Sequence, residues 1–333
     1  MKTYKLGSLF AGVGGIDLGF KQAGFKPVWA NEIDEYCEKT FTPNHEDVEL
    51  LVEDIKNIKG SDIPNIDILA GGFPCQPFSI AGYRQGLKDN RGDLFFHILR
   101  LIEELIEEGR PPKVIFLENV KNLFTHDDKR TYSFMKEELT KLGYHVTEDV
   151  LNTSTYGNIP QNRERLYIIA FRELNSFKNF KWPKPIDLDK TIEKVIDWNQ
   201  SVDSKYYYTE NLKCYPLLKS EVTNQHSIYQ YRRVYVRENK AGLSPTLTAN
   251  MGMGGHNVPI ILDSKNRIRK LTPRECFLLQ GFPKDFILPR NISDSRLYKQ
   301  AGNSVSVPVI ERLANQIKEA LNYGIDHQLQ FIS

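Results

Sequence analysis

The chain has 333 residues, with 44 basic and 42 acidic side chains and a formal net charge of +2. Hydrophobic residues make up 40% and charged residues 26% of the chain, which excludes an intrinsically disordered polyelectrolyte. The apolar runs, such as Leu166–Phe171, are far shorter than the roughly 18 residues of a membrane-spanning helix. The first residues lack the apolar stretch of a signal peptide, and we therefore expect a cytoplasmic protein.

Four scattered cysteines without a C-x-x-C pair argue against a disulfide scaffold and a zinc finger, and we expect no bound metal. The near-neutral total charge does not mark a nucleic-acid-binding protein, so that function would require a local basic surface. One region is basic: Lys184–Lys270 carries 14 basic and 9 acidic residues, whereas the rest of the chain carries 30 and 33. This distribution suggests DNA binding through a limited number of phosphate contacts.

Short apolar runs typical of buried strands recur through the first two thirds of the chain. They are Lys5–Phe10, Pro27–Asn31, Ile66–Ala70, Val114–Leu117, Tyr144–Leu151 and Leu166–Phe171. Helical spacing of apolar residues occurs between them at Asp93–Glu108 and Thr131–Leu142, and a glycine follows each of these segments. The alternation predicts an α/β fold with a mainly parallel sheet and helices on both faces.

The composition changes near Trp182, after which Tyr, Asn, Ser, Thr and glycine loops become frequent. We expect a catalytic and cofactor-binding domain over residues 1–182 and a small irregular domain over 183–268. Residues 269–333 are expected to return to the first domain through an amphipathic helix near Ser304–Leu321.

The segment Phe10–Gly15 (FAGVGG) follows the first strand and precedes a helical pattern. Glycines there let the backbone turn tightly and approach a nucleotide-type cofactor. The G-x-G-G spacing differs from G-x-G-x-x-G, which disfavours an NAD(P)-dependent oxidoreductase. Glu32 could accept hydrogen bonds from ribose hydroxyls and Asp54 could contact an adenine amino group, so the series favours an adenosine-containing cofactor.

The sequence GGFPCQPFS (71–79) places Cys75 directly after a predicted strand, at the carboxyl edge where open α/β folds bind ligands. Prolines on either side restrict the backbone, which favours a reactive thiol over a small buried cysteine. Glu118 ends the next strand and should lie at the same edge, where apolar surroundings can keep a carboxyl protonated.

Two arginines precede the strand at Leu166–Phe171. Alternation puts Arg163 and Arg165 on one face, where they could act as two fixed cations of a site. The alternative is that they form surface ion pairs with Glu164.

Together these segments closely resemble the bacterial DNA (cytosine-5)-methyltransferases. The family's signatures occur in order over nearly the whole chain: FAGVGG (10–15), NE (31–32), DI (54–55), GGFPCQPFS (71–79), RGDLFF (91–96), FLENV (116–120), QNRER (161–165), RKLTPREC (269–276), LQGFP (279–283) and YKQAGNSV (298–305). The resemblance implies a Rossmann-like class I S-adenosyl-L-methionine-dependent methyltransferase fold, with a mixed, mainly parallel sheet and a small target-recognition domain.

The resemblance implies methyl transfer from S-adenosyl-L-methionine to C5 of cytosine in double-stranded DNA, with S-adenosyl-L-homocysteine as the second product. Cys75 would add to cytosine C6 as a thiolate and so make C5 nucleophilic. Glu118 would contact N3 and the exocyclic amine, while Arg163 and Arg165 would help to hold O2 and the thiolate environment.

The same resemblance implies which residues would bind the cofactor: Phe10, Gly12, Gly14, Glu32, Ile33, Asp54, Ile55, Pro74, Leu94, Asn303 and Val305. Ile33 stands where relatives often have an aromatic side chain that packs on adenine, so this contact should be weakened.

A stacked cytosine is out of reach of this chemistry, so the base must be flipped out of the duplex. Residues 76–93 resemble the family's mobile catalytic loop, residues 229–237 alternate as a strand, and residues 246–257 form a glycine-rich polar loop. The expected DNA-binding residues are Arg84, Arg232, Arg233, Arg237, Thr248, Asn250, Gly252 and Gly254. Alternatively, the arginines contact only phosphates and the Thr/Gly segment is structural.

Most relatives are monomers that act alongside a restriction endonuclease, although solitary versions exist. One alternative activity is a tRNA cytosine-5 methyltransferase, because one branch of the family uses the same signatures on RNA. The long glycine-rich recognition segment favours duplex DNA. The other alternative is an inactive DNA-binding homologue, which the intact cysteine, glutamate and arginines disfavour.

Overall fold

The computed structural model describes residues 3–74, 94–253 and 257–330, with side chains up to Tyr323. Within these ranges the chain divides into two compact units. Unit 1 is built from the described parts of residues 1–151, 164–184 and 309–333, and unit 2 from those of 152–163 and 185–308.

Unit 1 contains one seven-stranded sheet with the order β3-β2-β1-β4-β5-β7-β6. Its strands are β1 (Lys5–Leu9), β2 (Lys26–Glu32), β3 (Glu49–Val52), β4 (Ile68–Gly72), β5 (Val114–Val120), β6 (His145–Asn152) and β7 (Glu164–Phe171). The pairs β1–β2, β1–β4, β2–β3 and β4–β5 are parallel, whereas β5 and β7 are antiparallel. This confirms the predicted mixed, mainly parallel sheet. The strand β3 was not predicted, because only four residues pair at the sheet edge and none of them is buried.

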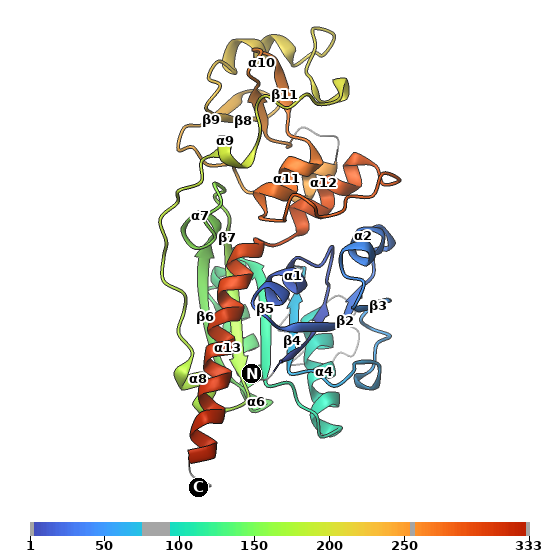
Figure 1. Ribbon diagram of the computed structural model, residues 1–333, viewed down its shortest axis with the longest axis vertical. Helices are drawn as coiled ribbons and strands as arrows, with labels where there is room; N and C mark the ends of the chain where they lie inside the picture. The colour runs from blue at the N-terminus through green and yellow to red at the C-terminus, as the bar shows by residue number, and fades with distance from the viewer. Residues whose placement is uncertain (1–2, 75–93, 254–256, 331–333) are drawn as a thin grey trace. The chain divides into compact units, whose positions relative to one another are not determined.

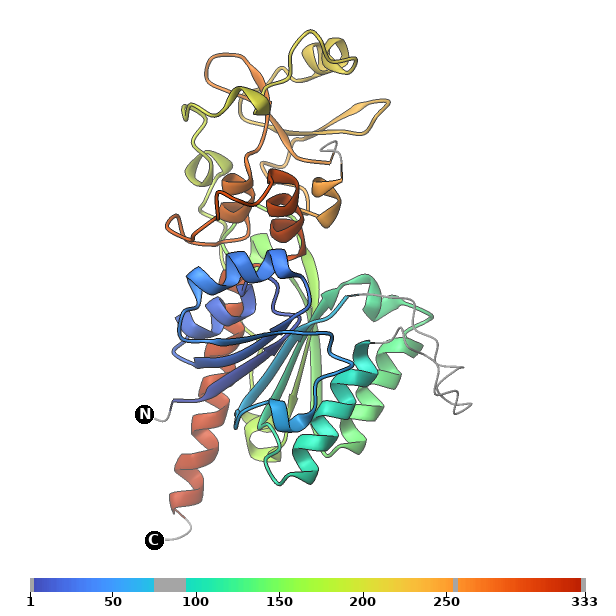
Figure 2. The same cartoon turned by 90° about the vertical axis from the view of Figure 1, so that its right-hand side faces the viewer.

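Helices cover both faces of this sheet, with α4 and α6 on one face and α1 and α13 on the other (Figures 1 and 2). The helices of unit 1 are α1 (Gly15–Gln22), α2 (Glu35–Phe41), α4 (Leu94–Glu107), α5 (Asn122–Thr125), α6 (Arg130–Lys141), α8 (Leu174–Asn179) and α13 (Val307–Gln330), with the 3-10 turns η1 (Thr42–Asn44) and η2 (Gly60–Asp62).

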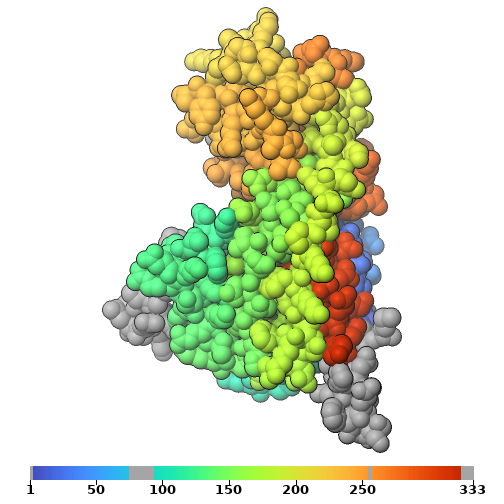
Figure 3. Space-filling model, turned by 90° about the vertical axis from the view of Figure 1, so that its left-hand side faces the viewer, coloured from blue at the N-terminus to red at the C-terminus, as the bar shows by residue number. Residues whose placement is uncertain are grey.

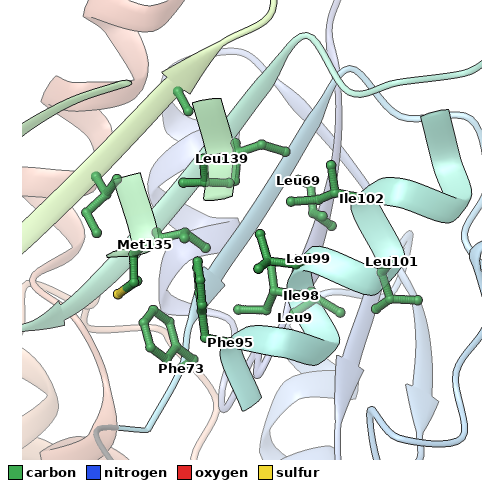
Figure 4. Packing of buried hydrophobic residues seen from close by; sticks show 14 of the residues in the cluster. Leu9, Leu69, Phe73, Phe95, Ile98, Leu99, Leu101, Ile102, Met135 and Leu139 are labelled. Carbon is green, nitrogen blue, oxygen red and sulfur yellow. The ribbon is translucent and has the colours of Figure 1, made fainter. Parts of the chain in front are cut away.

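The main core lies between the sheet and the helices α4 and α6 (Figure 4). Ile98, Leu101 and Ile102 recur at helical spacing on α4 and are fully buried. Burial of each such side chain contributes about 1.5–3 kcal/mol, so the apolar face of α4 holds the helix on the sheet. On the opposite face, the rings of Phe20 and Phe116 meet edge to face at 5.2 Å.

The helix α13 returns the end of the chain to unit 1. Its Lys318 donates to the Ala23 carbonyl at 3.0 Å, and Tyr4 donates to Asn322 at 3.1 Å. Residues near Lys184 lie beside α13, where Arg312 donates to the Lys184 carbonyl at 2.7 Å (Figure 3).

Unit 2 contains a small sheet with the order β11-β10-β8-β9 and several short helices. Its elements are α7 (Thr153–Tyr156), α9 (Ile192–Val195), η3 (Ser204–Tyr206), α10 (Tyr215–Glu221), β8 (Ile228–Tyr231), β9 (Val236–Asn239), η4 (Ala249–Gly252), β10 (Ile260–Leu262), β11 (Ile268–Lys270), α11 (Pro273–Leu279) and α12 (Asp294–Asn303). The pairs β8–β9, β8–β10 and β10–β11 are antiparallel.

The division into units differs from the expected domain boundaries in two respects. Residues 152–163 belong to unit 2, although they were expected in the domain over residues 1–182. The boundary after Lys184 lies close to the expected change at residue 182, but the chain enters unit 1 again at Val309 rather than at residue 269. Residues 269–308 stay in unit 2 because α12 packs closely on η4, where a Cβ added to Gly252 would lie 2.4 Å from the Ser295 carbonyl oxygen. Composition does not reveal such a contact.

Candidate active site

The glycine loop between β1 and α1 has a left-handed backbone at three of its residues. The φ angles are +54° at Phe10, +58° at Gly12 and +81° at Gly14, which is the N-cap of α1. The Ala11 amide donates to the Asn31 carbonyl at 2.9 Å and so ties the loop to the end of β2. Gly12 and Gly14 adopt this left-handed backbone without strain, whereas most other residues would be strained there.

Glu32 at the end of β2 holds the glycine loop and its own turn together. One carboxylate oxygen accepts from the Gly12 amide at 2.8 Å, and the other accepts from the amides of Ile33 and Asp34, both at 2.9 Å. Each carboxylate oxygen has about two lone-pair sites, so the oxygen that accepts from Gly12 keeps capacity for a further donor such as a ribose hydroxyl. Beside it, Ile33 leaves 62% of its surface exposed.

The neighbouring strand end brings a second acidic side chain to this edge. Asn31 donates to the carbonyls of Leu51 and Glu53 at 3.1 and 2.7 Å, which connects β2 to the residue before Asp54. The Asp54 carboxylate accepts from the Lys56 amide at 3.1 Å and is partly exposed.

Ile55 and Leu94 lie at the connection between this turn and α4. Arg100 of α4 donates to the Ile55 carbonyl at 2.9 Å, while the Ile55 side chain is buried. Leu94 begins α4 and packs against the main core while remaining partly exposed.

His45 is a residue of this region that sequence reasoning missed. It is buried, stacks on Phe41 with ring centroids 4.4 Å apart, and lies so close to the loop that a Cβ on Gly14 would meet its Nε2 at 2.1 Å. Burial lowers the pKa of His45 to about 4, so the ring is neutral at pH 7. A lone histidine after a 3-10 turn gives no local signal of such a contact.

Asp17 is a second buried titratable group beneath this loop. It lies in the first turn of α1, is fully buried, and accepts a hydrogen bond from the Ser8 hydroxyl at 2.7 Å. Burial raises the pKa of Asp17 to about 6, because the charged carboxylate loses its hydration.

Glu118 and Arg165 form an ion pair at the same edge of the sheet. Antiparallel pairing sets Arg165 of β7 opposite Val120 of β5, and Arg165 Nε lies 3.1 Å from Glu118 Oε1. Both side chains are largely buried, with 14% and 10% exposure. The ion pair therefore holds a carboxylate and a guanidinium side by side with little exposure to water.

The backbone that leads to Cys75 is held against Glu118 and its neighbour. A Cβ on Gly72 would lie 3.5 Å from Glu118 Oε2, and Asn119 donates to the Phe73 carbonyl at 2.9 Å in a buried hydrogen bond. Pro74 is exposed at the end of this described segment. The predicted nucleophile Cys75 itself lies outside the described residues, as do Arg84 and Gly254.

Glu164 does not form the surface ion pair with the arginines that was considered as the alternative. Its carboxylate accepts from Lys121 at 3.0 Å, and the hydrogen bond that Arg165 makes to Glu164 goes to the backbone carbonyl at 2.8 Å. Arg165 therefore lies with Glu118 at the sheet edge that carries the candidate site.

Arg163 has a different environment from Arg165. It belongs to unit 2, is buried, and its guanidinium donates to the carbonyls of Leu247, Gly302 and Ser304. The expectation that the two arginines act as a pair on one face does not match these contacts, because β7 begins only at Glu164 and Arg163 precedes it.

The two remaining predicted cofactor residues also belong to unit 2. Asn303 ends α12 with an exposed side chain, and Val305 is buried two residues later. The Ser304 between them accepts from Arg163.

The segment expected to be one strand at residues 229–237 is a β-hairpin, so the predicted strand is wrong. Tyr231 pairs with Val236, the Arg232 amide donates to the Tyr235 carbonyl at 2.8 Å, and Arg233 adopts a φ of +67° at the tip. A single strand over residues 229–237 does not form, because the chain reverses between Tyr231 and Val236.

The hairpin nevertheless presents a basic and exposed tip. Arg232, Arg233 and Arg237 are exposed, and the apolar Val234 and Tyr235 leave 83% and 54% of their surface exposed. A two-stranded ribbon of this kind fits the major groove of DNA.

The polar segment at residues 246–253 has two kinds of residue. Thr248 and Asn250 are exposed, whereas Gly252 packs closely on α12. The structural alternative therefore explains the glycine at 252, while the other two side chains remain available to a ligand.

Two absences concern only the described part of the chain. No group of three or more His, Cys, Asp or Glu residues there could hold a metal ion. No helix among the same residues is long and apolar enough to cross a membrane.

Comparison with known proteins places the chain in a family. The family model for C-5 cytosine-specific DNA methylases matches residues 4–319. The chain is 53% identical over 321 residues to the Type II methyltransferase M.Bsp6I of Bacillus sp. (strain RFL6), covering 95% of this chain and 99% of that protein. It is 40% identical over 322 residues to the Type II methyltransferase M.HaeII of Haemophilus aegyptius, covering 97% and 95%.

Among solved structures, a variant of DNMT2 from Spodoptera frugiperda matches with a TM-score of 0.72 at 23% identity, covering 95% of this chain and 100% of that chain. This likeness supports the fold alone. From the family match over nearly the whole chain and the ordered residues of the sheet edge, we conclude that the chain belongs to the C-5 cytosine-specific DNA methylases and is a DNA (cytosine-5-)-methyltransferase.

Proposed function

We propose that this enzyme transfers a methyl group from S-adenosyl-L-methionine to C5 of a flipped-out cytosine within a specific short sequence of duplex DNA. The observation that carries the proposal is the ion pair of Glu118 and Arg165 beside the backbone of Gly72 and Phe73, two residues before Cys75. A carboxyl group and a guanidinium at this strand edge, with a cysteine two residues further along the chain than Phe73, are the residue types that covalent activation of cytosine requires.

The glycine loop and the two acidic turns fit the proposed cofactor. A Cβ on Gly12 would meet nothing within 4 Å, Glu32 holds the Gly12 amide, and Ile33 exposes an apolar surface beside it. S-adenosyl-L-methionine, when bound, supplies the methyl group for C5 and leaves as S-adenosyl-L-homocysteine. Glu32 would hold the ribose, and Ile33 and Asp54 would contact the adenine.

Further residues are assigned to the cofactor by their positions in the family pattern. We assign Phe10, Gly14, Ile55, Pro74, Leu94, Asn303 and Val305 to this role. The left-handed backbone at Phe10 and Gly14 supports the assignment, because it turns the loop back over the strand end.

The reacting groups act in a defined order. The Cys75 thiolate forms a bond to C6, which breaks the C5=C6 double bond and makes C5 nucleophilic. Glu118 contacts N3 and the exocyclic amine and offsets the charge that enters the ring, while Arg165 orients Glu118. After methylation, loss of the C5 proton and elimination of Cys75 restore the double bond and release 5-methylcytosine.

DNA recognition is assigned to exposed residues of unit 2. Arg232, Arg233 and Arg237 would contact guanine edges or phosphates, and Thr248 and Asn250 would contact base edges. Arg84, Gly252 and Gly254 complete the proposed set. The enzyme would act as a cytoplasmic monomer and protect sites cut by a restriction endonuclease.

The decisive experiment is labelled methyl transfer to duplex DNA and, in parallel, to tRNA. We expect incorporation into DNA only, and bisulfite sequencing of DNA from expressing cells then gives the recognised site. Incorporation into tRNA alone would refute the proposed substrate.

The nucleophile is tested separately with Cys75→Ala. This variant should lose methylation and keep DNA binding, whereas Cys214→Ala, which changes a partly exposed cysteine of unit 2, should keep both. Duplex DNA with 5-fluorocytosine at the target should trap the enzyme covalently. Residual turnover by Cys75→Ala, or no trapped complex in a denaturing gel, would contradict the assignment.

A further inference from the structure

A buried joint in unit 2 connects the polar recognition segment to the segment that carries the proposed cofactor residues. Arg163 is only 2% exposed. Its Nη1 donates to the Leu247 carbonyl at 2.8 Å, and its Nη2 donates to the carbonyls of Gly302, at 3.3 Å, and Ser304. A single planar guanidinium therefore binds both segments at once.

Gln161 makes a second connection between the same parts of the chain. Its side-chain oxygen accepts from the Leu247 amide at 3.1 Å, and its Nε2 donates to the Leu279 carbonyl at 2.6 Å. Gln280, which is 3.2 Å from Gln161, donates in turn to the Ala301 carbonyl at 2.7 Å. The joint thus has two buried arms: one ends at Gly302 and Ser304, and the other ends at the adjacent Ala301.

The two segments are also packed without space between them. A Cβ on Gly302 would lie 2.1 Å from the carbonyl carbon of Thr248. A shift of either segment must therefore displace the other or break the hydrogen bonds of Arg163, and close packing transmits such shifts.

We propose that Arg163 is a positioning residue that couples cofactor binding to DNA binding. The inference rests on the proposed function, which assigns Asn303 and Val305 to the cofactor and Thr248 and Asn250 to DNA. Leu247 directly precedes Thr248, and Gly302 and Ser304 flank Asn303, so a ligand that orders one segment reduces the cost of ordering the other. The coupling acts equally in both directions.

The residue type follows from the geometry. An arginine presents several N–H donors in a rigid plane and can hold three carbonyls, whereas a lysine presents one compact ammonium on a flexible stem. Arg163→Lys should keep the positive charge but lose the simultaneous hydrogen bonds to both segments.

The first test uses the unmodified protein and measures amide hydrogen exchange with and without S-adenosyl-L-homocysteine, in the absence of DNA. Binding should slow exchange at least threefold in peptides that contain Leu247 and Met251, whose amides donate to Gln161 and to the Thr248 carbonyl. Unchanged exchange there at saturating S-adenosyl-L-homocysteine would overturn the coupling, whether or not any variant folds.

The second test measures the affinity for a duplex carrying the methylated site, with and without S-adenosyl-L-homocysteine. The ratio of the two affinities is the coupling factor, which is expected to be roughly 5–150 in the wild type. In Arg163→Lys it should fall towards one, while the affinity for each ligand alone changes less than threefold. A wild-type factor of one would overturn the proposal.

Arg269→Lys is the matched control. Arg269 is fully buried in the same unit and holds Glu275 with two hydrogen bonds at 2.9 and 2.7 Å, but it bonds neither segment of the joint. Its replacement should lower Tm as Arg163→Lys does and leave the coupling factor unchanged. An equal loss of coupling in both variants, or none in Arg163→Lys, would refute a specific role for Arg163.

Failure of the proposed function gives a different result. Wild-type protein that binds neither S-adenosyl-L-homocysteine nor the duplex would refute that function, whereas separate binding without coupling refutes only the inference about Arg163.

Discussion

Two glycines of the same loop are predicted to respond differently to the same substitution. Gly12 and Gly14 both have positive φ angles, +58° and +81°. A Cβ on Gly14 would lie 2.1 Å from His45 Nε2, whereas a Cβ on Gly12 would meet nothing within 4 Å. We predict that Gly14→Ala mainly destabilises the fold and that Gly12→Ala mainly weakens cofactor binding.

The magnitudes follow from these two environments. A left-handed backbone costs an alanine about 1–2 kcal/mol at either position. At Gly14 the clash with His45 adds about 1–3 kcal/mol, because the ring is buried and stacked on Phe41 and cannot move freely. Gly14→Ala should therefore lower the free energy of unfolding by roughly 2–5 kcal/mol, against roughly 1–2 kcal/mol for Gly12→Ala.

Urea unfolding and calorimetric titration with S-adenosyl-L-homocysteine measure the two effects. In Gly12→Ala the new methyl group enters the open space beside the amide that Glu32 holds, so affinity should fall at least tenfold, which corresponds to about 1.4 kcal/mol. In Gly14→Ala the loss of affinity should be accompanied by the larger loss of stability.

A double-mutant cycle tests the physical cause. His45→Ala removes the clashing ring, so it should cost less in the Gly14→Ala background than in the wild type, with a coupling energy of about 1–3 kcal/mol. The reasoning is refuted if Gly14→Ala is no more destabilising than Gly12→Ala, or if the cycle shows no coupling. In either case the contact with His45 would not be the cause of the destabilisation by Gly14→Ala.

Three other predictions concern pH, the ion pair and DNA contacts. Burial raises the pKa of Asp17 from 3.8 to about 6, so its contribution to stability is lost as pH rises through this range, whereas burial lowers the pKa of His45 from 6.5 to about 4, so its contribution is lost as pH falls. The two effects have opposite signs, so each variant should show the pH dependence of the group that remains. Urea unfolding of Asp17→Asn should show a free energy of unfolding that rises by about 3 kcal/mol between pH 4 and 6, and His45→Phe should show a comparable fall. Flat profiles in both variants would contradict these pKa values. Arg165→Met should cost about 3 kcal/mol of stability by removing the cation beside Glu118, and Glu118→Gln should recover part of it; additive effects in thermal unfolding would exclude the coupling. Arg233→Ala should reduce the slope of log affinity for DNA against log salt concentration by about one, which corresponds to one phosphate contact. An unchanged slope would place the hairpin tip away from the DNA backbone.

Most of the sheet and its site edge could be predicted from the sequence, because these features depend on local patterns. The apolar run Val114–Leu117 identified β5, and its carboxyl end therefore had to carry Glu118 to the same edge as the strand before Cys75. The glycine loop was recognisable because a tight turn after a strand needs glycine at positive φ.

The hairpin of unit 2 shows why alternation alone misled the prediction. Residues 228–231 and 236–239 each alternate as a strand does, and no glycine, asparagine or proline marks the reversal between them. Arg233 takes the positive φ that such a residue usually avoids, so the turn has no typical sequence signal.

The sequence by itself determined which segments form the strands and helices of the main sheet. It also determined the sheet edge at which the site lies and which residue types the site contains. These features could be predicted because the spacing of apolar residues and the position of loop glycines are local properties. Only the tertiary structure separated Arg163 from Arg165, since Arg163 bonds carbonyls that lie 84 to 141 residues away in the chain. It also decided that His45 packs on Gly14 and that residues 269–308 belong to unit 2. The physical reason is the same in each case: close packing brings distant segments together, and no local pattern records which segments will meet.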